Sequence, residues 1–172
     1  MNKTKTFANI AIIAALYTAV SLALASIYYG NIQVRIAEGL TLLPLVFQPA
    51  IYGVTLGCFL TNLIGAMTGA NLLGFMDCII GTLATFLAAI CTYKLRDIKM
   101  SKLPVLSILM PVIFNMIIIG AELGYCLFPK ELFLQGSIIS GLEVAAGELV
   151  SVILGWFLLQ GLIKTKIFEG RQ

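Results

Sequence analysis

The stretch that decides the fold is FANIAIIAALYTAVSLALASIYY, residues 7–29, which carries no charged side chain over 23 positions. A helix that crosses the hydrocarbon core of a bilayer needs about 20 mainly apolar residues. The stretch is too long for the apolar core of a secretory signal peptide, which spans about 7–15 residues. We therefore predict a transmembrane helix over residues 7–29.

The composition of the whole chain agrees with this first prediction. Of its 172 residues, 60% are apolar and 11% are charged, and the mean hydropathy is +1.02. Soluble globular domains carry about 45–50% apolar and about 25% charged residues. These values exclude a soluble domain, a disordered chain and a disulfide scaffold, and they predict an integral membrane protein.

Further apolar runs follow the first one, at residues 31–47, 50–67, 75–93, 103–128 and 137–163. With six spans, nine of the eleven cationic residues lie on one side of the membrane. Positive charge in short loops marks the cytoplasmic side, so both termini are predicted to be cytoplasmic. The nine residues are Lys3, Lys5, Lys94, Arg96, Lys99, Lys102, Lys164, Lys166 and Arg171. The second run is the shortest, and Arg35 and Glu38 interrupt it.

Several kinds of chemistry are missing from the sequence. There is no histidine, the four cysteines form no CxxC pair, and there is no GxxxxGK[ST] phosphate-binding loop. We therefore expect no metal site, no cofactor, no ATP binding by this chain and no enzymatic activity. The net charge of +3 reflects topology and contact with lipid headgroups, so nucleic-acid binding is not expected.

Five carboxylates lie within or at the ends of the apolar runs: Glu38, Asp77, Glu122, Glu143 and Glu148. A charge at the bilayer centre costs roughly 2.5–3.5 kcal/mol, so these side chains are expected to face the protein interior or an aqueous cavity. The predicted topology places them in the outer half of the membrane. One arginine, Arg35, accompanies them, which favours a ligand that is cationic or rich in N–H donors.

Helical spacing refines this expectation. Arg35 and Glu38 are three residues apart and can pair on one face, and Asn115 and Glu122 also share a face. Glu143 and Glu148 are five residues apart, which separates them by about 140° around a helix. They cannot both point at one pocket, and Glu143 is the one expected to be structural.

Small residues recur at every fourth position of three runs. The first run has Ala11, Ala15, Ala19 and Ala23, a pattern that permits close approach of another helix. We interpret this ridge as a surface for docking another membrane protein. The ridges of the third run (Gly53, Gly57, Thr61 and Gly65) and of the sixth (Gly147, Ser151 and Gly155) are expected to pack within the bundle.

Several strings lie in order along nearly the whole chain. They are IQVRIAEGL at residues 32–40, GC at 57–58 with Asn62, Asp77 with GTLAT at 81–85, PVIFN at 111–115 and GEL at 147–149. Together they resemble the QueT family, substrate-binding S-components of energy-coupling factor transporters. The resemblance implies a single six-helix substrate-binding domain over residues 1–172, in the cell membrane of a prokaryote.

The resemblance also implies a function. The chain would capture a queuosine precursor, a 7-deazaguanine such as 7-aminomethyl-7-deazaguanine, from outside the cell. Uptake would be driven by a module of one transmembrane T-protein and two ATPases, docked on Ala11, Ala15 and Ala19. A carboxylate can accept two N–H bonds from a guanine-like edge. The residues expected to bind the substrate are Arg35, Glu38, Asn62, Asp77, Asn115, Glu122 and Glu148.

Other interpretations stay open. The chain could be an S-component for another vitamin or nucleobase, because one fold serves many ligands. It could be a proton-coupled secondary carrier that uses Glu122 or Glu148 as a proton relay. A structural subunit without a ligand is disfavoured by the acidic residues in the outer half.

Overall fold

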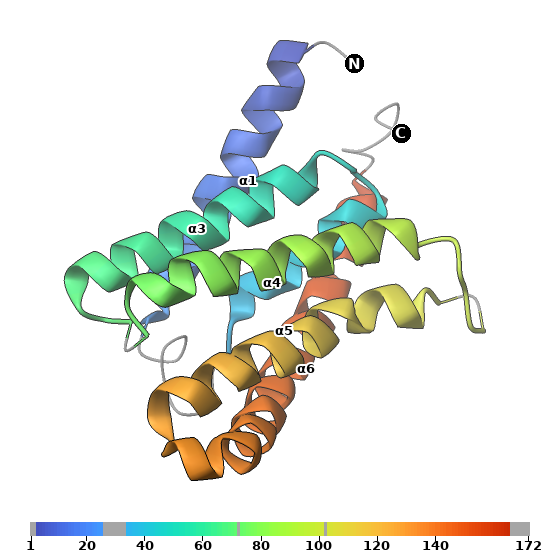
Figure 1. Ribbon diagram of the computed structural model, residues 1–172. Helices are drawn as coiled ribbons and strands as arrows, with labels where there is room; N and C mark the ends of the chain where they lie inside the picture. Colours follow the sequence, from blue (N-terminus) through green and yellow to red (C-terminus); the bar gives the residue numbers. More distant parts are fainter. Residues whose placement is uncertain (1–2, 26–33, 72, 102, 166–172) are drawn as a thin grey trace.

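The computed structural model describes residues 3–25, 34–71, 73–101 and 103–165 (Figure 1). Its elements in chain order are α1 (Lys3–Ala23), the 3-10 helix η1 (Ile36–Leu45), α3 (Ala50–Thr68), α4 (Phe75–Lys94), α5 (Val105–Leu127), the 3-10 helix η2 (Lys130–Leu132) and α6 (Phe133–Lys164). The described residues include no β-strand, apart from a single bridge between Met100 and Leu103. The all-helical fold predicted from the sequence is confirmed.

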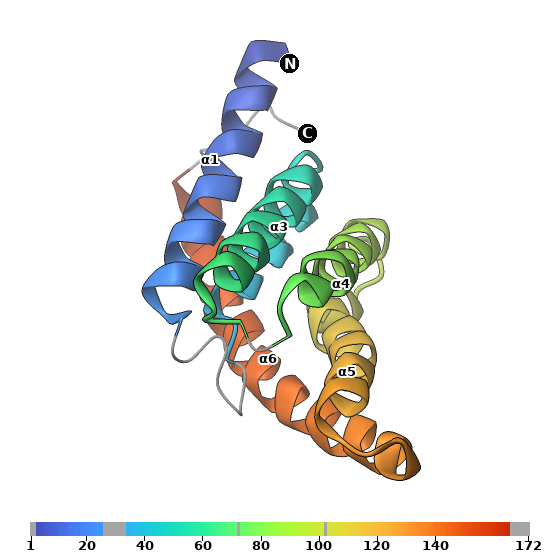
Figure 2. The ribbon, with the colours of Figure 1, turned by 60° about the vertical axis from the view of Figure 1, so that its left-hand side comes forward.

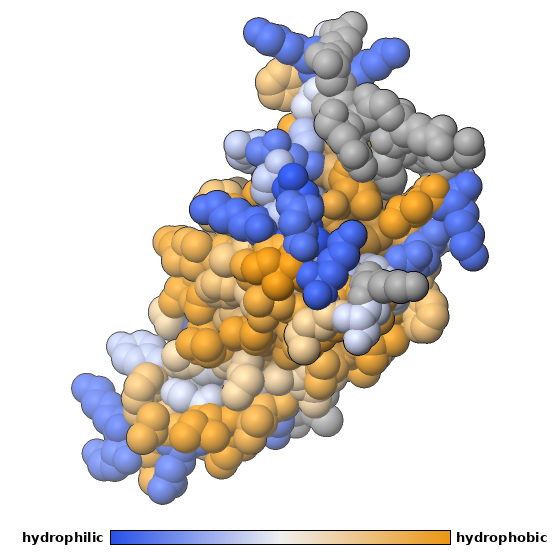
Figure 3. All heavy atoms as spheres, turned by 90° about the vertical axis from the view of Figure 1, so that its right-hand side faces the viewer, coloured by the Kyte–Doolittle hydropathy of each residue, from blue (hydrophilic) through white to orange (hydrophobic). Residues whose placement is uncertain are grey.

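Five of the helices, α1, α3, α4, α5 and α6, are long and apolar enough to cross a membrane. The boundaries of α3, α4 and α5 lie within two residues of the predicted runs, and α6 begins four residues earlier than predicted. Large apolar side chains cover their outer surfaces, for example Phe157 and Ile79, which are 70% and 73% exposed. Figure 3 shows this apolar surface as a continuous area between hydrophilic ends.

The second predicted span is not a membrane-length α-helix. Residues 31–33 of that run lie outside the described residues, and residues 36–45 form η1, a 3-10 helix of ten residues. At about 2.0 Å per residue, η1 is about 20 Å long, shorter than a hydrocarbon core of about 30 Å. Its residues from Ala37 to Pro44 are all buried, and it packs against α1, α3, α4, α5 and α6. The surrounding helices thus shield its charged groups from lipid.

The directions of the helices follow from which residues meet. Gly53 of α3 lies against Ile13 of α1, and Gly57 lies against Tyr17, so α1 and α3 run in the same direction. The chain between them must therefore return to the side on which it started, and η1 is part of that return. Thr92 donates to the Ser107 carbonyl oxygen, which makes α4 and α5 antiparallel neighbours.

The two ends of the described chain lie at the same end of the bundle. Figures 1 and 2 show the start of α1 and the end of α6 both directed toward the upper end. The end of α4, the start of α3 and the end of α6 also meet there, around one cavity. The structure has five membrane-length helices and the short η1 where the sequence predicts six spans, so the six-pass topology stays a prediction. The assignment of this end to the cytoplasm stays a prediction. Of the nine cations on which it depends, Lys102, Lys166 and Arg171 lie outside the described residues.

Glycines let η1 approach α6 closely. A Cβ atom on Gly39 would lie 2.6 Å from the Ser151 carbonyl oxygen, and one on Gly155 would overlap with the Gly39 backbone. Gly53 and Gly57 likewise allow α3 to contact α1. The prediction that the later small-residue ridges pack within the bundle is confirmed at these positions. Figure 2 shows the resulting order, with α1 beside α3 on one side and α5 beside α6 on the other.

Candidate functional site

An ion pair between Arg35 and Asp77 links the residue just before η1 to the first turn of α4. Arg35 Nη2 lies 3.5 Å from Asp77 Oδ2, and both side chains are 1% exposed. The Asn71 amide also donates to Asp77 Oδ2, at 2.8 Å, and Asn62 Nδ2 of α3 donates to the Asp77 carbonyl oxygen at 3.0 Å. Asp77 is therefore held in place by three separate segments of the chain.

The Glu38 carboxylate is held by α1 and α4. Its Oε1 accepts a hydrogen bond from the Tyr17 hydroxyl at 2.5 Å and one from Thr85 Oγ1 at 2.6 Å. The sequence predicted that Glu38 pairs with Arg35. The Arg35 charge does act on Glu38, but the ion pair at 3.5 Å is with Asp77. Glu38 is fully buried, and its second oxygen has no hydrogen-bond partner among the described residues.

Two further carboxylates are buried without any described partner. Both oxygens of Glu122 on α5 and both oxygens of Glu148 on α6 lack a hydrogen bond within the described part of the chain. Glu122 is 3% exposed and Glu148 is 0% exposed. Buried polar atoms in native proteins are nearly always hydrogen-bonded, because leaving one unsatisfied costs about 1–3 kcal/mol. Glu122 and Glu148 are thus acceptors that a bound molecule can use.

Arg35 connects the four carboxylates electrostatically. Glu122 is within range of the charges of Asp77 and Arg35, and Glu148 is within range of Glu38 and Arg35. Four predicted site residues on four different elements therefore lie within electrostatic range of one guanidinium group, and Asp77 is the one in contact with it at 3.5 Å. With one cation facing four acids, the cluster favours ligands that bring positive charge or several N–H donors.

Two of the predicted site residues are buried amides. Asn62 is fully buried, and its Oδ1 has no described hydrogen-bond partner, although its Nδ2 is bonded as described above. Asn115 is also fully buried, and neither its nitrogen nor its oxygen is paired within the described residues. Asn115 precedes Glu122 by seven residues and lies on the same buried side of α5, as the spacing predicted.

Glu143 does not belong to the site. The sequence suggested that all five acids would face the interior or a cavity, but Glu143 is exposed on the outer surface of α6. The reason is its position about 140° from Glu148 around the helix. Since Glu148 is buried, Glu143 faces outward. The expectation that these two residues cannot serve one pocket is confirmed.

Three residues that position the acids were missed by the sequence reasoning. They are Tyr17, Thr85 and Asn71, which hydrogen-bond to Glu38 or Asp77. Tyr17 offered a signal, because a tyrosine in the middle of an apolar helix needs a partner for its hydroxyl group. Thr85 appears in the sequence only as part of the string GTLAT at 81–85, and Asn71 carries no such signal.

The small-residue ridge of α1 lies outside the bundle. Ala11, Ala15 and Ala19 are exposed, whereas Ile13, Ala14, Tyr17 and Ser21 on the other side of α1 are buried. The ridge that the sequence assigned to partner docking is therefore accessible in this chain. In this respect it differs from the glycine ridges of α3 and α6.

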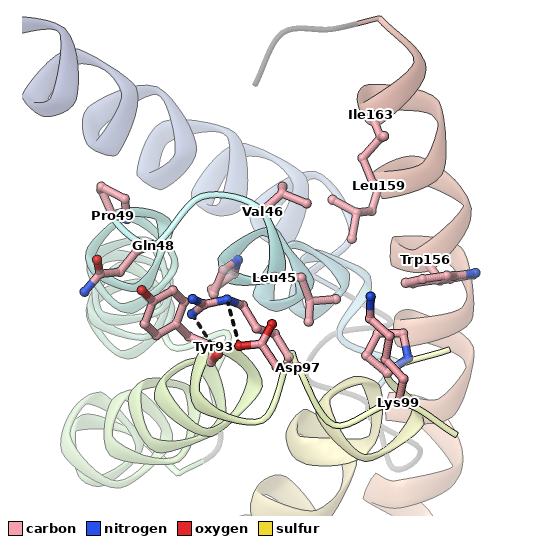
Figure 4. Close-up of a pocket in the computed structure, with 13 residues that line it drawn as sticks. Leu45, Val46, Gln48, Pro49, Tyr93, Asp97, Lys99, Trp156, Leu159 and Ile163 are labelled. Carbon is pink, nitrogen blue, oxygen red and sulfur yellow. Dashed lines mark hydrogen bonds and ion pairs between the residues drawn. The ribbon is translucent and has the colours of Figure 1, made fainter. Parts of the chain in front are cut away.

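A cavity of about 680 Å³ lies at the opposite end of the bundle from Asp77 (Figure 4). Its walls include Tyr93, Arg96 and Trp156, and none of the predicted site residues lines it. Asp77 begins α4 and Tyr93 ends it, so this cavity and the acidic cluster are separated by most of the length of that helix. No three acidic or cysteine residues in the described ranges are grouped closely enough to hold a metal ion.

Comparison with known proteins identifies one family. The family model described as QueT transporter matches residues 7–164. A protein named Queuosine precursor transporter QueT, from Lactococcus lactis subsp. cremoris (strain MG1363), is 35% identical over 89 residues. That alignment covers 49% of this chain and 48% of the relative, so the chain spans about half the length of the curated relative it matches. No solved structure matches the chain.

Proposed function

Because the chain belongs to the QueT transporter family, we propose that it binds a queuosine precursor from outside the cell for uptake. The ligand is a 7-deazaguanine such as 7-aminomethyl-7-deazaguanine, a precursor of the kind named for the Lactococcus relative. The chain acts as the S-component of an energy-coupling factor transporter in a prokaryotic cell membrane. Its partners are one transmembrane T-protein and two ATPases, which supply the energy.

The observation that carries this proposal is the pair of buried carboxylates without described partners, Glu122 and Glu148. A deazaguanine with an aminomethyl group offers two separate sets of donors. One set is the N1–H and 2-amino group on the edge of the base, and the other is the ammonium group on the five-membered ring. Two carboxylates on different helices match two donor sets on opposite sides of a flat ligand.

Glu148 is suited to the edge of the base. It is fully buried, and it lies within electrostatic range of Glu38, which is also fully buried. A carboxylate can accept two parallel N–H bonds, and hydrogen bonds to a charged group contribute about 1.5–3 kcal/mol each. Removing the neutral edge of a guanine from water costs less free energy than removing an ammonium group. The base edge is therefore assigned to Glu148, the more buried carboxylate.

Glu122 is suited to the ammonium group. It lies near the end of α5, toward the end of the bundle where α4 begins. Both Asp77 and Arg35 act on it, and it retains slight exposure. An ammonium group placed beside Glu122 and Asp77 would compensate the excess of negative charge. In this arrangement Arg35 is the proposed donor to the carbonyl oxygen of the base.

The exposed ridge of α1 supports the proposed partnership. Ala11, Ala15 and Ala19 form a smooth strip on which a helix of the T-protein can pack closely. The opposite side of α1 carries Tyr17, which donates a hydrogen bond to Glu38. Helix α1 therefore contacts both the proposed partner and the proposed ligand site. Docking and ligand binding therefore involve two sides of one helix.

A titration of the purified, detergent-solubilised protein tests the proposal. The panel contains 7-aminomethyl-7-deazaguanine, 7-cyano-7-deazaguanine, guanine, riboflavin and thiamine. We expect saturable heat or fluorescence changes with the deazaguanines and none with the vitamins. Saturable binding of a vitamin, with no binding of deazaguanines, would replace the proposed ligand class.

Uptake in proteoliposomes tests the S-component role separately. Unpaired buried acids also suit a proton-coupled carrier, in which Glu122 or Glu148 would carry the proton. The proposal predicts no accumulation of ligand when this chain alone is reconstituted under a proton gradient. Accumulation under those conditions would support the carrier and contradict the S-component.

A further inference from the structure

The cavity of about 680 Å³ at the end of the bundle has a mixed lining (Figure 4). It lies between the turn that follows η1, the loop after α4, and the last turns of α6. Leu159, Ile163 and Trp156 of α6 form an apolar side. Arg96 and Lys99 of the loop after α4 supply positive charge. Its volume falls in the range of about 300–1,000 Å³ that is common for small-ligand sites.

Arg96 is held in a fixed position on the cavity wall. Its guanidinium group lies 3.9 Å from the centre of the Tyr93 ring, and its Nη1 donates to the Tyr93 carbonyl oxygen at 3.2 Å. Its ion pair with Asp97 is long, at 3.8 Å, and the Asp97 side chain is 84% exposed. Such exposed pairs contribute little, because water screens them. The guanidinium group has five N–H donors and can therefore bind a further anion.

The position of the cavity limits what can occupy it. It lies at the end where α4 and α6 end, and the face shown in Figure 3 has hydrophilic groups at this end above a broad apolar surface. Asp97 and Lys99 are exposed whereas Leu159 is buried, so a molecule in the cavity meets charge near the protein surface and apolar side chains deeper in. Trp156 stands at this boundary, where tryptophan is enriched in membrane proteins. These features fit an anionic group that is joined to an acyl chain.

We propose that this cavity binds an anionic phospholipid, with the headgroup phosphate on Arg96 and with Lys99 adding positive charge to the lining. One acyl chain packs on Leu159 and Trp156. Two cations face one acid, Asp97, within the lining, so the cavity is complementary to a single negative charge. Basic pockets between membrane helices on the cytoplasmic side are known to bind such headgroups. This inference is independent of the ligand bound at the acidic cluster.

Native mass spectrometry of the purified protein tests the proposal, with phosphatidylglycerol and phosphatidylcholine supplied in equal amounts. We expect phosphatidylglycerol to be retained in preference. The variant Arg96→Gln should lower its retention about fivefold, the factor that corresponds to one cation near an anionic membrane surface. Lys130→Gln is the matched control, because Lys130 is exposed and lies outside the cavity. It should leave retention unchanged.

Three outcomes would overturn the proposal. Equal retention of the two lipids would show that the phosphate charge is not recognised. Retention by Arg96→Gln equal to that of the wild type would remove Arg96 from the site. If inorganic phosphate alone raised the melting temperature as much as phosphatidylglycerol does, the site would belong to a soluble phosphate. A wild-type elution volume in size-exclusion chromatography and a cooperative thermal unfolding transition verify that Arg96→Gln is folded.

Discussion

At the residue scale, the buried carboxyl groups divide into two that are held and two that are available. Asp77 is bound by Arg35 and Asn71, and Glu38 is bound by Tyr17 and Thr85. Glu122 and Glu148 have no described hydrogen-bond partner. In the proposed function, the held pair fixes the shape and charge of the site, and the available pair supplies the oxygens that contact the ligand.

The hydroxyl group of Tyr17 is expected to matter for both stability and binding. Tyr17→Phe removes a donor from the Glu38 carboxylate, and a hydrogen bond to a charged group contributes about 1.5–3 kcal/mol. We predict a lower melting temperature and weaker deazaguanine binding, measured by thermal unfolding and by titration. Tyr52→Phe is the control, because Tyr52 is 62% exposed on α3 and should change neither. Equal effects of the two variants would contradict this role of Tyr17.

The Glu122 carboxylate is expected to control selectivity rather than binding in general. In Glu122→Gln, the affinity for 7-aminomethyl-7-deazaguanine should fall about tenfold, since an ion pair with the ligand ammonium is lost. The affinity for 7-cyano-7-deazaguanine, which has no ammonium group, should change little. The measurement is a pair of titrations. An equal loss for both ligands would contradict the assignment of the ammonium group to Glu122.

The sequence indicated the charged residues of the candidate site, which are buried in the structure, but not the residues that hold them. Arg35, Asp77 and Glu148 stand out in the sequence, because a charged side chain in a membrane-spanning run is costly unless it has a partner or a function. Tyrosine and threonine are common in apolar helices, so Tyr17 and Thr85 do not stand out in the sequence. Their role depends on contacts across 21 and 47 residues of sequence, which no local pattern encodes.

At the element scale, the position of η1 depends on its contact with α6. Gly155→Ala would force a Cβ atom into the Gly39 backbone. Overpacking of this kind costs about 1–3 kcal/mol, so we predict a lower melting temperature. Deazaguanine binding should weaken as well, because η1 carries Glu38 and directly follows Arg35. Thermal unfolding with and without ligand measures both effects.

Gly161→Ala is the matched control on the same helix. A Cβ atom on Gly161 meets no other atom within 4 Å, so alanine should be tolerated or should stabilise the helix by up to about 1 kcal/mol. Equal melting temperatures of Gly155→Ala and Gly161→Ala would show that the close contact of η1 with α6 does not contribute to stability.

The form of η1 could not be predicted from the sequence. The spacing of Arg35 and Glu38 showed that residues 31–47 differ from the other runs. However, hydropathy alone does not distinguish a spanning helix from a short buried one. The burial of Ala37 to Pro44 on all sides results from packing between five other helices, which is a property of the tertiary structure.

At the scale of the whole molecule, the ridge of small residues on α1 faces away from the buried acidic residues. Ala15→Leu adds bulk to this exposed strip without touching the core. With the partner module co-reconstituted, we predict loss of ATP-driven uptake and unchanged ligand binding. Ala146→Leu on the exposed surface of α6 is the control and should preserve both. Normal uptake by Ala15→Leu would contradict docking through the ridge.

The central claim is that the buried acids bind a deazaguanine, and one comparison on α6 tests it most directly. Glu148→Gln and Glu143→Gln make the same chemical change five residues apart, at a buried and an exposed position. The account predicts that titration with 7-aminomethyl-7-deazaguanine shows about tenfold or greater loss of affinity for Glu148→Gln and none for Glu143→Gln. Wild-type affinity in Glu148→Gln, or an equal loss in both variants, would contradict it.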